Sequence, residues 1–537
     1  MRGLQGAGSR AGEMVRRGSR AGGMAAGQVP ALIVGAGPAG LTAAITLARQ
    51  GVQVLLVERR RDLSALPRAT SISVRSMELL RSWGLEEEVR AGGVEVEWLA
   101  WVCETLSGAS TGVAMPTGYP TAEQSALISP TAPACVPQDH LEPVLLDHLR
   151  SFAGVRVELG AEVVGIDPVN RDSRPDGVRA VLRDVDTGVS RVVDARYLLA
   201  ADGAHSRVRN ALGIPMHGTD HGVEAATALF RAPLWDLLGE CRYGIYPVTH
   251  PEASGVFLPA GRGDRWLYFR QWEAGQQQLA NLDDEAIGRL IKLGVGIANM
   301  TLRIERTRIG AFSFAAQLAK RFRQGNAFLI GDAAHRVTPR GGTGMNTAMQ
   351  SAYDLGWKLA WVLRGWAKVE LLDSYDVERR PVAEHNVARS DDPKGSFRSA
   401  EQELHVDLGG RLPHVWVPDP RVPAAIGRVC TLDLLGPGLT LYTGPESAPW
   451  AAAAARVCAR VPIGVRSLDV ISARALGIGR DGALLTRPDG SPAGSWRHGH
   501  DAVPGLEAAL TSALVGCHTM VEPAPAVHHR ALIGNVA

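Results

Sequence analysis

The sequence predicts an α/β protein with more than one domain. The chain has 537 residues, more than one hydrophobic core usually supports. A strand, a glycine-rich turn and a helix follow one another near the start, and two later apolar segments each run into a turn that holds Gly and Asp. In an open parallel sheet such turns gather at the edge where the strands end. A Rossmann-like dinucleotide-binding domain is therefore expected.

The first segment is an apolar strand from Pro30 to Val34, followed by a turn and by apolar residues at helical spacing from Leu41 to Arg49. The first glycine of the turn permits a tight bend, the second lets a pyrophosphate approach, and the third lets helix and strand pack closely. N–H groups at the helix start attract phosphate. The candidate cofactor-binding residues here are Gly35, Ala36, Gly37, Pro38, Ala39 and Gly40.

An acidic residue ends the next predicted strand, which runs from Val52 to Val57 and leads into Glu58 and Arg59. Glu58 follows the glycines by about twenty residues, where a carboxylate accepts hydrogen bonds from an adenosine ribose. The turn alone does not separate FAD from NAD, and a glycine turn without a ligand is the alternative. Glu58 and Arg59 favour FAD.

Two further strands end in similar turns. One runs from Arg196 to Ala201 and leads into Asp202 and Gly203, and the other runs from Ala327 to Ile330 and leads into Gly331 and Asp332. A carboxylate just past a strand end is well placed to bind the ribityl hydroxyls of a flavin. Either segment alone is more often an ordinary strand exit. The three segments together, in this order, predict one FAD site.

A glycine-rich loop then feeds a long helix, which is predicted from Thr347 to Leu363. N–H groups at the start of such a helix face negative charge. Reduced flavin carries that charge near N1 and O2, so this helix start is expected to stabilise it. The candidate contacts in the loop are Pro339, Gly342, Gly344, Met345 and Asn346.

These motifs resemble the FAD-dependent aromatic monooxygenases of the p-hydroxybenzoate hydroxylase class, and above all the actinobacterial aromatic polyketide hydroxylases. The resemblance covers residues 29–500. It implies that the first motif binds the ADP half of FAD, that Asp202-Gly203 serves the pyrophosphates of FAD and NADPH, and that Gly331-Asp332 binds the ribityl chain. Thr343 and Ser351 depart from the Gln and Asp that many relatives carry, which leaves the glycine backbone intact.

Two more segments sharpen the resemblance. Pro67-Arg68-Ala69 with the following segment 73–80 resembles the family's Pro-Arg-Ala and Arg-(Thr/Ser)-Met-Glu pattern, which places Arg75 near the FAD phosphates. Pro137-Gln138 resembles the family's glutamine-containing helix start, so Gln138 is expected to contact the cofactor.

The domain organisation expected from these segments has five parts. A C-terminal thioredoxin-like domain is implied by the resemblance, and the absence of a CxxC pair excludes dithiol exchange there. The parts are a disordered basic tail (1–28), the first part of the FAD-binding domain (29–215, with a substrate-domain excursion near 95–125), a substrate-binding sheet domain (216–305), the second part of the FAD-binding domain (306–395) and the C-terminal domain (396–537).

The substrate domain reads as alternating strands between residues 223 and 275, which predicts an antiparallel sheet. Trp266, Tyr268, Arg270 and Trp272 are candidate lining groups, although ordinary packing is favoured for each. No catalytic residue is assigned. The six cysteines form no CxxC pair and His528-His529 offers too few ligands, so no metal is expected.

Composition narrows the range of partners. The net charge of +2 gives no sign of nucleic acid binding, and no apolar run approaches the roughly 20 residues that span a bilayer. We expect a cytoplasmic protein with a small polycyclic aromatic substrate, and a homodimer is left open.

The resemblance implies an NAD(P)H-dependent FAD monooxygenase. It would use O2 to oxygenate a polycyclic, polyketide-type phenol or quinone through a flavin C4a-hydroperoxide, in antibiotic biosynthesis, with NADPH as the favoured donor. One alternative is a Baeyer–Villiger or ring-rearranging flavoenzyme on the same substrate class. A second is a flavin-binding redox module without oxygenase turnover.

Overall fold

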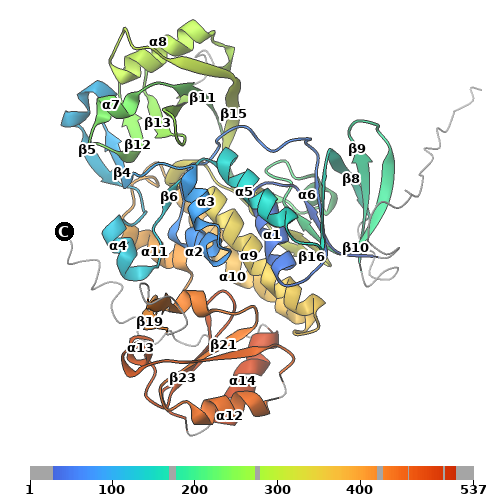
Figure 1. Cartoon of the computed structure of the whole chain (residues 1–537). Coiled ribbons are helices and arrows are strands. Elements are labelled where there is room, and N and C mark those ends of the chain that lie inside the picture. The colour runs from blue at the N-terminus through green and yellow to red at the C-terminus, as the bar shows by residue number, and fades with distance from the viewer. Residues whose placement is uncertain are drawn as a thin grey trace, which may run out of the picture.

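The computed structural model describes residues 28–167, 177–272, 279–419, 427–457, 459–499 and 502–515. The predicted tail, apart from Gln28, and the pair His528-His529 lie outside these ranges. Figure 1 shows three parts: a sheet domain at the top, a central domain with long helices, and a C-terminal domain at the bottom. The predicted α/β fold class is confirmed, with a mixed second sheet.

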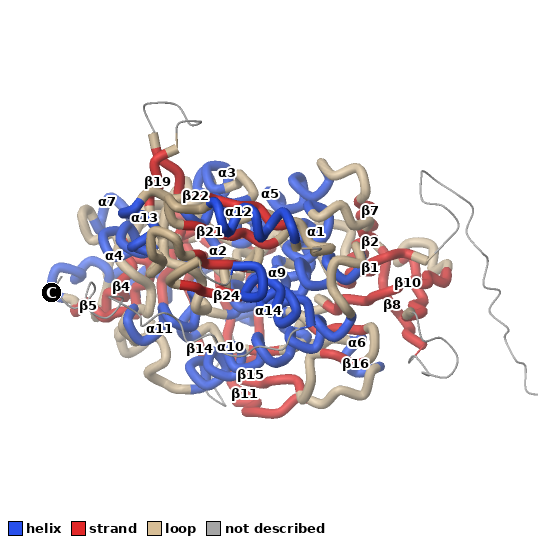
Figure 2. The backbone as a smooth tube through the Cα atoms, turned by 90° about the horizontal axis from the view of Figure 1, so that it is seen from below, coloured by secondary structure: helices blue, strands red, loops and turns tan. Residues whose placement is uncertain are grey.

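The central sheet is built from strands β1 (Val29–Val34), β2 (Val54–Glu58), β7 (Val155–Leu159), β8 (Ala161–Asp167), β9 (Val178–Asp184), β10 (Ser190–Ala200), β16 (Arg323–Gln324) and β17 (Ala327–Leu329). Its order is β16-β17-β10-β1-β2-β7, and every pair from β17 to β7 is parallel. β8 and β9 extend β10 in antiparallel fashion and project from one side in Figure 1 and Figure 2. The parallel part is the arrangement expected of a dinucleotide-binding sheet.

Helices cover this sheet and connect it to its neighbours. α9 packs along α1, and α1 also contacts α5. The helices of the central domain and its extension are α1 (Pro38–Arg49), α2 (Val74–Ser82), α3 (Glu86–Ala91), α4 (Ala122–Ile128), α5 (Gln138–Arg150), α6 (Arg207–Ala211), α9 (Gly344–Leu363), α10 (Ser374–Asp391) and α11 (Ala400–Leu408). The short pair β3 (Ser71–Ile72) and β6 (Ala134–Cys135) and the 3-10 turns η3 (Gly331–Ala333), η4 (Arg340–Gly342) and η5 (Val369–Asp373) complete it.

The second sheet has the order β18-β15-β11-β14-β13-β12-β4-β5. Its strands are β4 (Glu97–Val102), β5 (Val113–Pro116), β11 (Met216–Arg231), β12 (Tyr243–Val248), β13 (Gly255–Pro259), β14 (Arg265–Trp272), β15 (Arg303–Ala319) and β18 (His335–Arg336). Neighbours are antiparallel as predicted, except that β12 pairs with β4 in parallel. β4 and β5 belong to the chain segment near 95–125. α7 (Leu234–Leu238), α8 (Asp284–Val295) and the 3-10 turns η1 (Leu106–Thr111) and η2 (Leu279–Asn281) belong to this domain.

The C-terminal domain holds a four-stranded sheet of order β22-β21-β23-β24. β21 pairs with β22 in parallel, and the pairs β21–β23 and β23–β24 are antiparallel. Its elements are β19 (Trp416–Pro418), β20 (Arg428–Cys430), η6 (Thr431–Leu434), β21 (Leu439–Thr443), α12 (Ala448–Arg456), β22 (Ile463–Ser467), α13 (Val470–Ala475), β23 (Ala483–Thr486), β24 (Pro492–Trp496) and α14 (Ala502–Val515). Among the described residues, no helix combines the length and apolarity needed to cross a membrane.

One hydrophobic core joins the central and C-terminal domains. Leu441 and Leu485 of the C-terminal sheet belong to the same cluster of buried residues as β1 and α9. Trp357 and Trp361 of α9 are fully buried, with their rings 4.8 Å apart. The indole N–H of Trp361 donates to the carbonyl of Pro437 at 2.9 Å. α9 therefore depends on both domains for its burial.

We predict that Trp361→Ala lowers the free energy of unfolding by about 3–5 kcal/mol, because it leaves a large cavity where the domains meet. The midpoint of urea unfolding measures this change. Val377→Ala is the control, since Val377 is 69% exposed and its loss should change stability by less than about 0.5 kcal/mol. Equal midpoints for the two variants would contradict the shared core.

Candidate functional site

The three glycine-marked turns meet at one edge of the central sheet. Val34 pairs with Ala200, and Ala200 pairs with Leu329, so the ends of β1, β10 and β17 lie at one level. The N–H of Ile330 donates to the carbonyl of Ala200 at 2.9 Å. A Cβ atom on Gly331 would lie 3.0 Å from Cβ of Ala39. The sequence motifs thus converge on one place.

The first turn shows which glycines the fold requires. Gly35 has φ +107°, and a Cβ atom there would lie 2.3 Å from the carbonyl oxygen of Ala201. A Cβ atom on Gly40 would lie 1.9 Å from the carbonyl oxygen of Gly35. At Gly37, by contrast, a Cβ atom would meet no described atom within 4 Å. Gly35 and Gly40 serve packing, whereas Gly37 borders open space.

Helix α1 begins at Pro38 and Ala39, beside that space. Its N-cap residue is Gly37, and no side chain of the described residues makes a capping hydrogen bond to the start of this helix. The first N–H groups of a helix have no partner within it, and they favour an anion. This end of α1 is suited to a pyrophosphate.

Glu58 lies beside the same turn. Its carboxylate accepts hydrogen bonds from the N–H of Ala36 and from the N–H of Arg60, each at 2.9 Å. Arg59 follows it with an exposed side chain. The position next to the glycines is the one from which a carboxylate reaches a ribose.

Gln138 begins α5 at the same edge. Its N–H donates to the carbonyl of Ala69 at 2.8 Å, and its side-chain amide donates to Glu142 at 2.6 Å. Burial raises the pKa of Glu142 to about 7, although Gln138 and Arg68 act to lower it. The fold thus gathers Gln138, Glu142 and Arg68.

Arg68 and Glu142 lie beside Gln138, although sequence reasoning did not name them as candidate site residues. The pKa of Arg68 is lowered by burial and by Arg60, while Glu142 and Asp332 act to raise it. The guanidinium of Arg68 therefore lies within electrostatic range of carboxylates from two motifs. The Pro-Arg-Ala pattern carried the signal, because its arginine directly precedes the residue that bonds Gln138.

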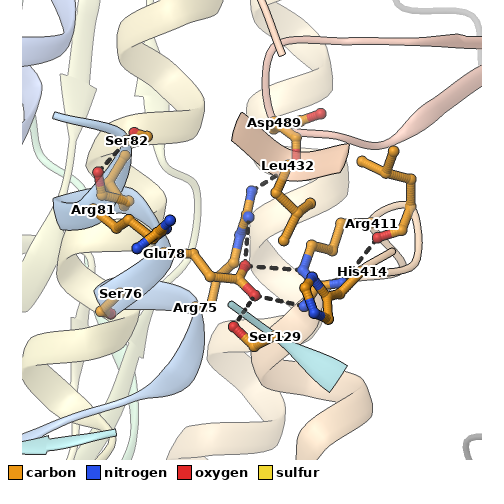
Figure 3. A network of polar contacts seen from close by, with 12 residues as sticks. Arg75, Ser76, Glu78, Arg81, Ser82, Ser129, Arg411, His414, Leu432 and Asp489 are labelled. Carbon is orange, nitrogen blue, oxygen red and sulfur yellow. Dashed lines mark hydrogen bonds and ion pairs between the residues drawn. The ribbon is translucent and has the colours of Figure 1, made fainter. Parts of the chain in front are cut away.

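Arg75 lies elsewhere. Its guanidinium donates to Glu78 at 2.9 Å and to the carbonyl of Asp489 at 2.6 Å, and Arg411 donates to the same Glu78 (Figure 3). Burial would raise the pKa of Glu78, but Arg411 and Arg75 lower it below its usual range. The expectation that Arg75 lies near the FAD phosphates stays a prediction, while in this structure its guanidinium is bonded to Glu78 and to the C-terminal domain at Asp489.

The second turn is held by its own side chains. Asp202 accepts hydrogen bonds from the hydroxyl of Ser206, which is the N-cap residue of α6, and from the N–H of Val208 in the first turn of that helix. Gly203 has φ +83° and open space around it. Arg209 donates to the carbonyls of Ala204 and Ala333 and so ties this turn to the third.

The third turn carries Asp332, whose side chain reaches solvent. The protein atoms around it raise the pKa of this carboxyl, and the nearby Arg336 and Arg68 reduce the shift. Three residues on, burial and the charge of Arg379 lower the pKa of His335 to about 3. Neither ring nitrogen of His335 has a partner in the described part of the chain. His335 is therefore a neutral group behind the turn.

The flavin loop, residues 339–346, is fixed by hydrogen bonds around Asn346. The side-chain oxygen of Asn346 accepts from the N–H of Ser73 at 2.8 Å, and its amide donates to the carbonyls of Ser71 and Gly342. The hydroxyl of Tyr119 also donates to the carbonyl of Gly342, at 3.0 Å. Burial raises the pKa of Tyr119, so this hydroxyl keeps its proton.

Helix α9 begins at Gly344, three residues earlier than predicted. Asn346 therefore lies in the first turn, and its side chain is occupied by the protein rather than directed at a ligand. The early N–H groups at Gly344 and Met345 are the ones that remain for a ligand. Pro339, at the other end of the flavin loop, is exposed.

The second sheet turns an aromatic pair toward this loop. Phe269 stacks on Phe314, with centroids 6.0 Å apart and planes 12° apart, and the guanidinium of Arg340 lies over the Phe314 ring at 5.8 Å. Arg340 belongs to the flavin loop. Phe314 is fully buried and Phe269 is half-buried, so the pair joins the second sheet to this loop by aromatic packing, a contact that sequence reasoning missed.

Two of the candidate lining groups lie on the other face. Trp266 and Tyr268 are fully buried in the core that α7 and α8 share with the sheet. Alternate residues of a strand point to opposite faces, so Phe269 faces away from that core. Arg270 interacts with the Tyr268 hydroxyl, and the side chain of Trp272 lies outside the described residues. The sequence showed that alternate residues of this strand point to opposite faces of the sheet, but it did not show which set faces the core.

One cluster of acids has the spacing of a metal site. Ligand atoms of Asp354, Glu378 and Asp489 lie within 4.8 Å of one another. Lys358 contacts Asp354 at 2.8 Å and Glu378 at 3.0 Å, and Arg487 contacts Glu378 and Asp489 at 2.8 and 2.7 Å. Two cations already neutralise these carboxylates.

Comparisons with known proteins agree with this geometry. The FAD binding domain family matches residues 28–390, and the family of C-terminal domains of aromatic-ring hydroxylases matches residues 405–515. Tetracenomycin B2 monooxygenase-dioxygenase of Streptomyces olivaceus is 34% identical over 534 residues, covering 88% of this chain and 95% of the relative.

Two further proteins share the whole architecture. Aklavinone 12-hydroxylase RdmE of Streptomyces purpurascens is 33% identical over 539 residues, covering 91% of this chain and 99% of the relative. The crystal structure of aklavinone-11 hydroxylase with FAD and aklavinone superposes with a TM-score of 0.80 and 31% identity, over 91% of this chain and 100% of that one.

The glycine turn offers a direct test of the site. We predict that Gly37→Ala keeps the melting temperature of the FAD-free protein but weakens FAD binding by at least about tenfold, because the methyl group enters open space beside the helix start. Fluorescence titration of FAD measures the affinity.

Gly40→Ala is the comparison variant. Its methyl group would collide with Gly35, so both stability and FAD binding should fall. If Gly37→Ala bound FAD as tightly as the unaltered protein, the phosphates would not lie at this turn.

Proposed function

Because the chain belongs to the family of FAD-dependent aromatic-ring hydroxylases, we propose that it is an NAD(P)H-dependent monooxygenase acting on a polycyclic, polyketide-type phenol or quinone. The observation that carries this proposal is the meeting of three glycine-marked strand ends at one sheet edge, with the half-buried Phe269 of the second sheet near the flavin loop. NADPH is the favoured donor, and O2 is the oxidant.

The geometry supports a set of proposed cofactor contacts. The start of α1 at Gly37 would hold the pyrophosphate, Glu58 would accept from the adenosine ribose, and Asp332 would accept from the ribityl chain. The N–H groups at the start of α9 would stabilise negative charge on the reduced flavin. Bound FAD supplies hydride acceptance from NAD(P)H and activation of O2.

The remaining site residues of the proposal complete this cradle. Gly331 leaves room beside Ala39, Gly342 lies close to the Tyr119 hydroxyl, and Gly344 lies close to Val337. Arg68 and Glu142 join Gln138 near the phosphates. The full proposed set is Gly35, Ala36, Gly37, Pro38, Ala39, Gly40, Glu58, Arg59, Arg68, Gln138, Glu142, Asp202, Gly203, Gly331, Asp332, Pro339, Gly342, Gly344, Met345 and the backbone of Asn346.

The substrate is expected between the flavin loop and the sheet. Aromatic side chains in offset stacking suit a flat, fused-ring substrate, and the half-buried Phe269 is the member of the Phe269–Phe314 pair that such a substrate would reach. The guanidinium of Arg340 lies beside the same pair, where a cation would favour the phenolate form of a phenol. The chain's contribution to the reaction is to orient the ring and exclude water.

We predict that tetracyclic phenols stimulate NADPH oxidation and O2 uptake by the purified protein, with a product heavier by one oxygen. Consumption assays with mass spectrometry of the product measure this. Oxygen insertion beside a ketone would favour the ring-inserting alternative. Bound FAD with no stimulated NADPH oxidation by any phenol would contradict the proposal and favour a redox module.

We also predict that Phe269→Leu raises KM for a tetracyclic phenol by about 3- to 10-fold, because one aromatic stacking partner contributes roughly 0.5–1.5 kcal/mol. The affinity for FAD should stay unchanged. Phe152→Leu is the matched control, since Phe152 is half-buried beside α5, away from the second sheet. An equal rise in KM for both variants would remove Phe269 from the substrate surface.

A further inference from the structure

Helix α11 leads from the central domain into the C-terminal domain and sends one carboxylate to the base of the flavin loop. One oxygen of Asp407 accepts from the hydroxyl of Ser73 at 2.6 Å and from the side-chain amide of Gln350 at 2.7 Å. The other accepts from the N–H of Arg75 at 3.2 Å. Asp407 thus joins α11 to the starts of α2 and α9.

The residues that donate hydrogen bonds to Asp407 are themselves connected to the flavin loop. The N–H of Ser73 donates to the side-chain oxygen of Asn346, and the amide of Asn346 donates to the carbonyl of Gly342. Gln350 lies one helical turn beyond Asn346 on α9. Asp407 therefore supports both the residue that holds the loop and the helix that follows it.

A cavity beside this network makes the hydrogen bonds important. It has a volume of about 40 Å³ and is lined by Ser73, Tyr119, Thr343, Asn346, Gln350 and Asp407 among others. Side chains that line a cavity make fewer packing contacts on that side. Hydrogen bonds therefore contribute to holding the loop on this face.

The chemistry of the position calls for a carboxylate. The hydroxyl of Ser73 and the amide of Gln350 both donate, and the N–H of Arg75 can only donate. An ionised Asp accepts at both oxygens, whereas an Asn would direct its NH2 group at one of the donors. The side-chain oxygen of Gln350 interacts with Arg379 at 3.4 Å, which opposes rotation of the Gln350 amide.

We propose that Asp407 is a positioning residue, through which the C-terminal domain sets the shape of the flavin loop and hence the affinity for FAD. Within the described residues, the side chain of Asp407 is linked to the proposed cofactor-binding residues only indirectly, through Ser73 and Gln350. This inference rests on the FAD-binding part of the proposed function and not on the oxygenation step.

The test compares FAD affinity with stability. We expect Asp407→Asn to raise the Kd for FAD, measured by adding FAD to FAD-free protein, by at least about tenfold. It should also shift the visible absorption of the bound flavin. Asp433→Asn is the matched control, because Asp433 also joins the two domains, through Arg81, without a link to the flavin loop. It should leave both FAD readouts unchanged.

A polarity swap gives the sharper result. Gln350→Glu alone places two carboxylates together and should weaken FAD binding. When Asp407→Asn is combined with Gln350→Glu, the introduced amide can donate to the introduced carboxylate, which keeps its second oxygen for Arg379. The double variant should therefore restore the Kd to within about threefold of the unaltered protein. If Asp407→Asn does not fold, the inference is tested by comparing the Kd for FAD of Gln350→Glu with that of the double variant.

Additive losses in the double variant, or a Kd for Asp407→Asn equal to that of Asp433→Asn, would overturn the inference. The titrations use neither NADPH nor substrate. A protein that binds FAD but oxygenates nothing would therefore contradict the proposed function. The FAD titrations would still test the positioning role of Asp407.

Discussion

The close approach of three strand ends is the constraint on which the rest of the molecule depends. β1, β10 and β17 finish side by side, and Gly35 fits against Ala201 only because it lacks a side chain. Gly40 in turn lets α1 descend onto that turn. Once these contacts form, the residues proposed to bind the phosphates, ribose and ribityl chain of one FAD lie at one edge of the sheet. The wide sequence gaps between the motifs are spanned by the second sheet and by hairpins at the margin.

Helix α9 extends this constraint to the other domains. Its start lies at the flavin loop, its middle packs on α1, and its last turns share a core and a buried ion-pair cluster with the C-terminal domain. Removing one partner from a buried charge cluster leaves the others without compensation, which is strongly unfavourable. The C-terminal domain, which lacks CxxC, therefore acts by holding the central domain. Asp407 is the point where that support reaches the proposed cofactor site.

Much of this was predictable from local pattern, because glycine turns, strand ends and helix periodicity are written in neighbouring residues. The strand, turn and helix of the first motif and the strands that lead into Asp202-Gly203 and Gly331-Asp332 appear as expected. Contacts between residues far apart in the sequence were not predictable. Both Arg68 and Arg75 fitted the family pattern, and only the fold shows that Arg75 pairs with Glu78. The phase of β14 likewise depends on which face α8 covers, and α9 starts early because Asn346 is bonded to a strand distant in sequence.

The central claim is that this chain places one oxygen atom from O2 on a fused aromatic ring. Turnover with NADPH and a tetracyclic phenol under 18O2 tests it most directly. The account predicts a product that carries one 18O atom, and unlabelled product when the label is in water instead. Label that enters only from water, or oxidised product without added oxygen, would contradict it.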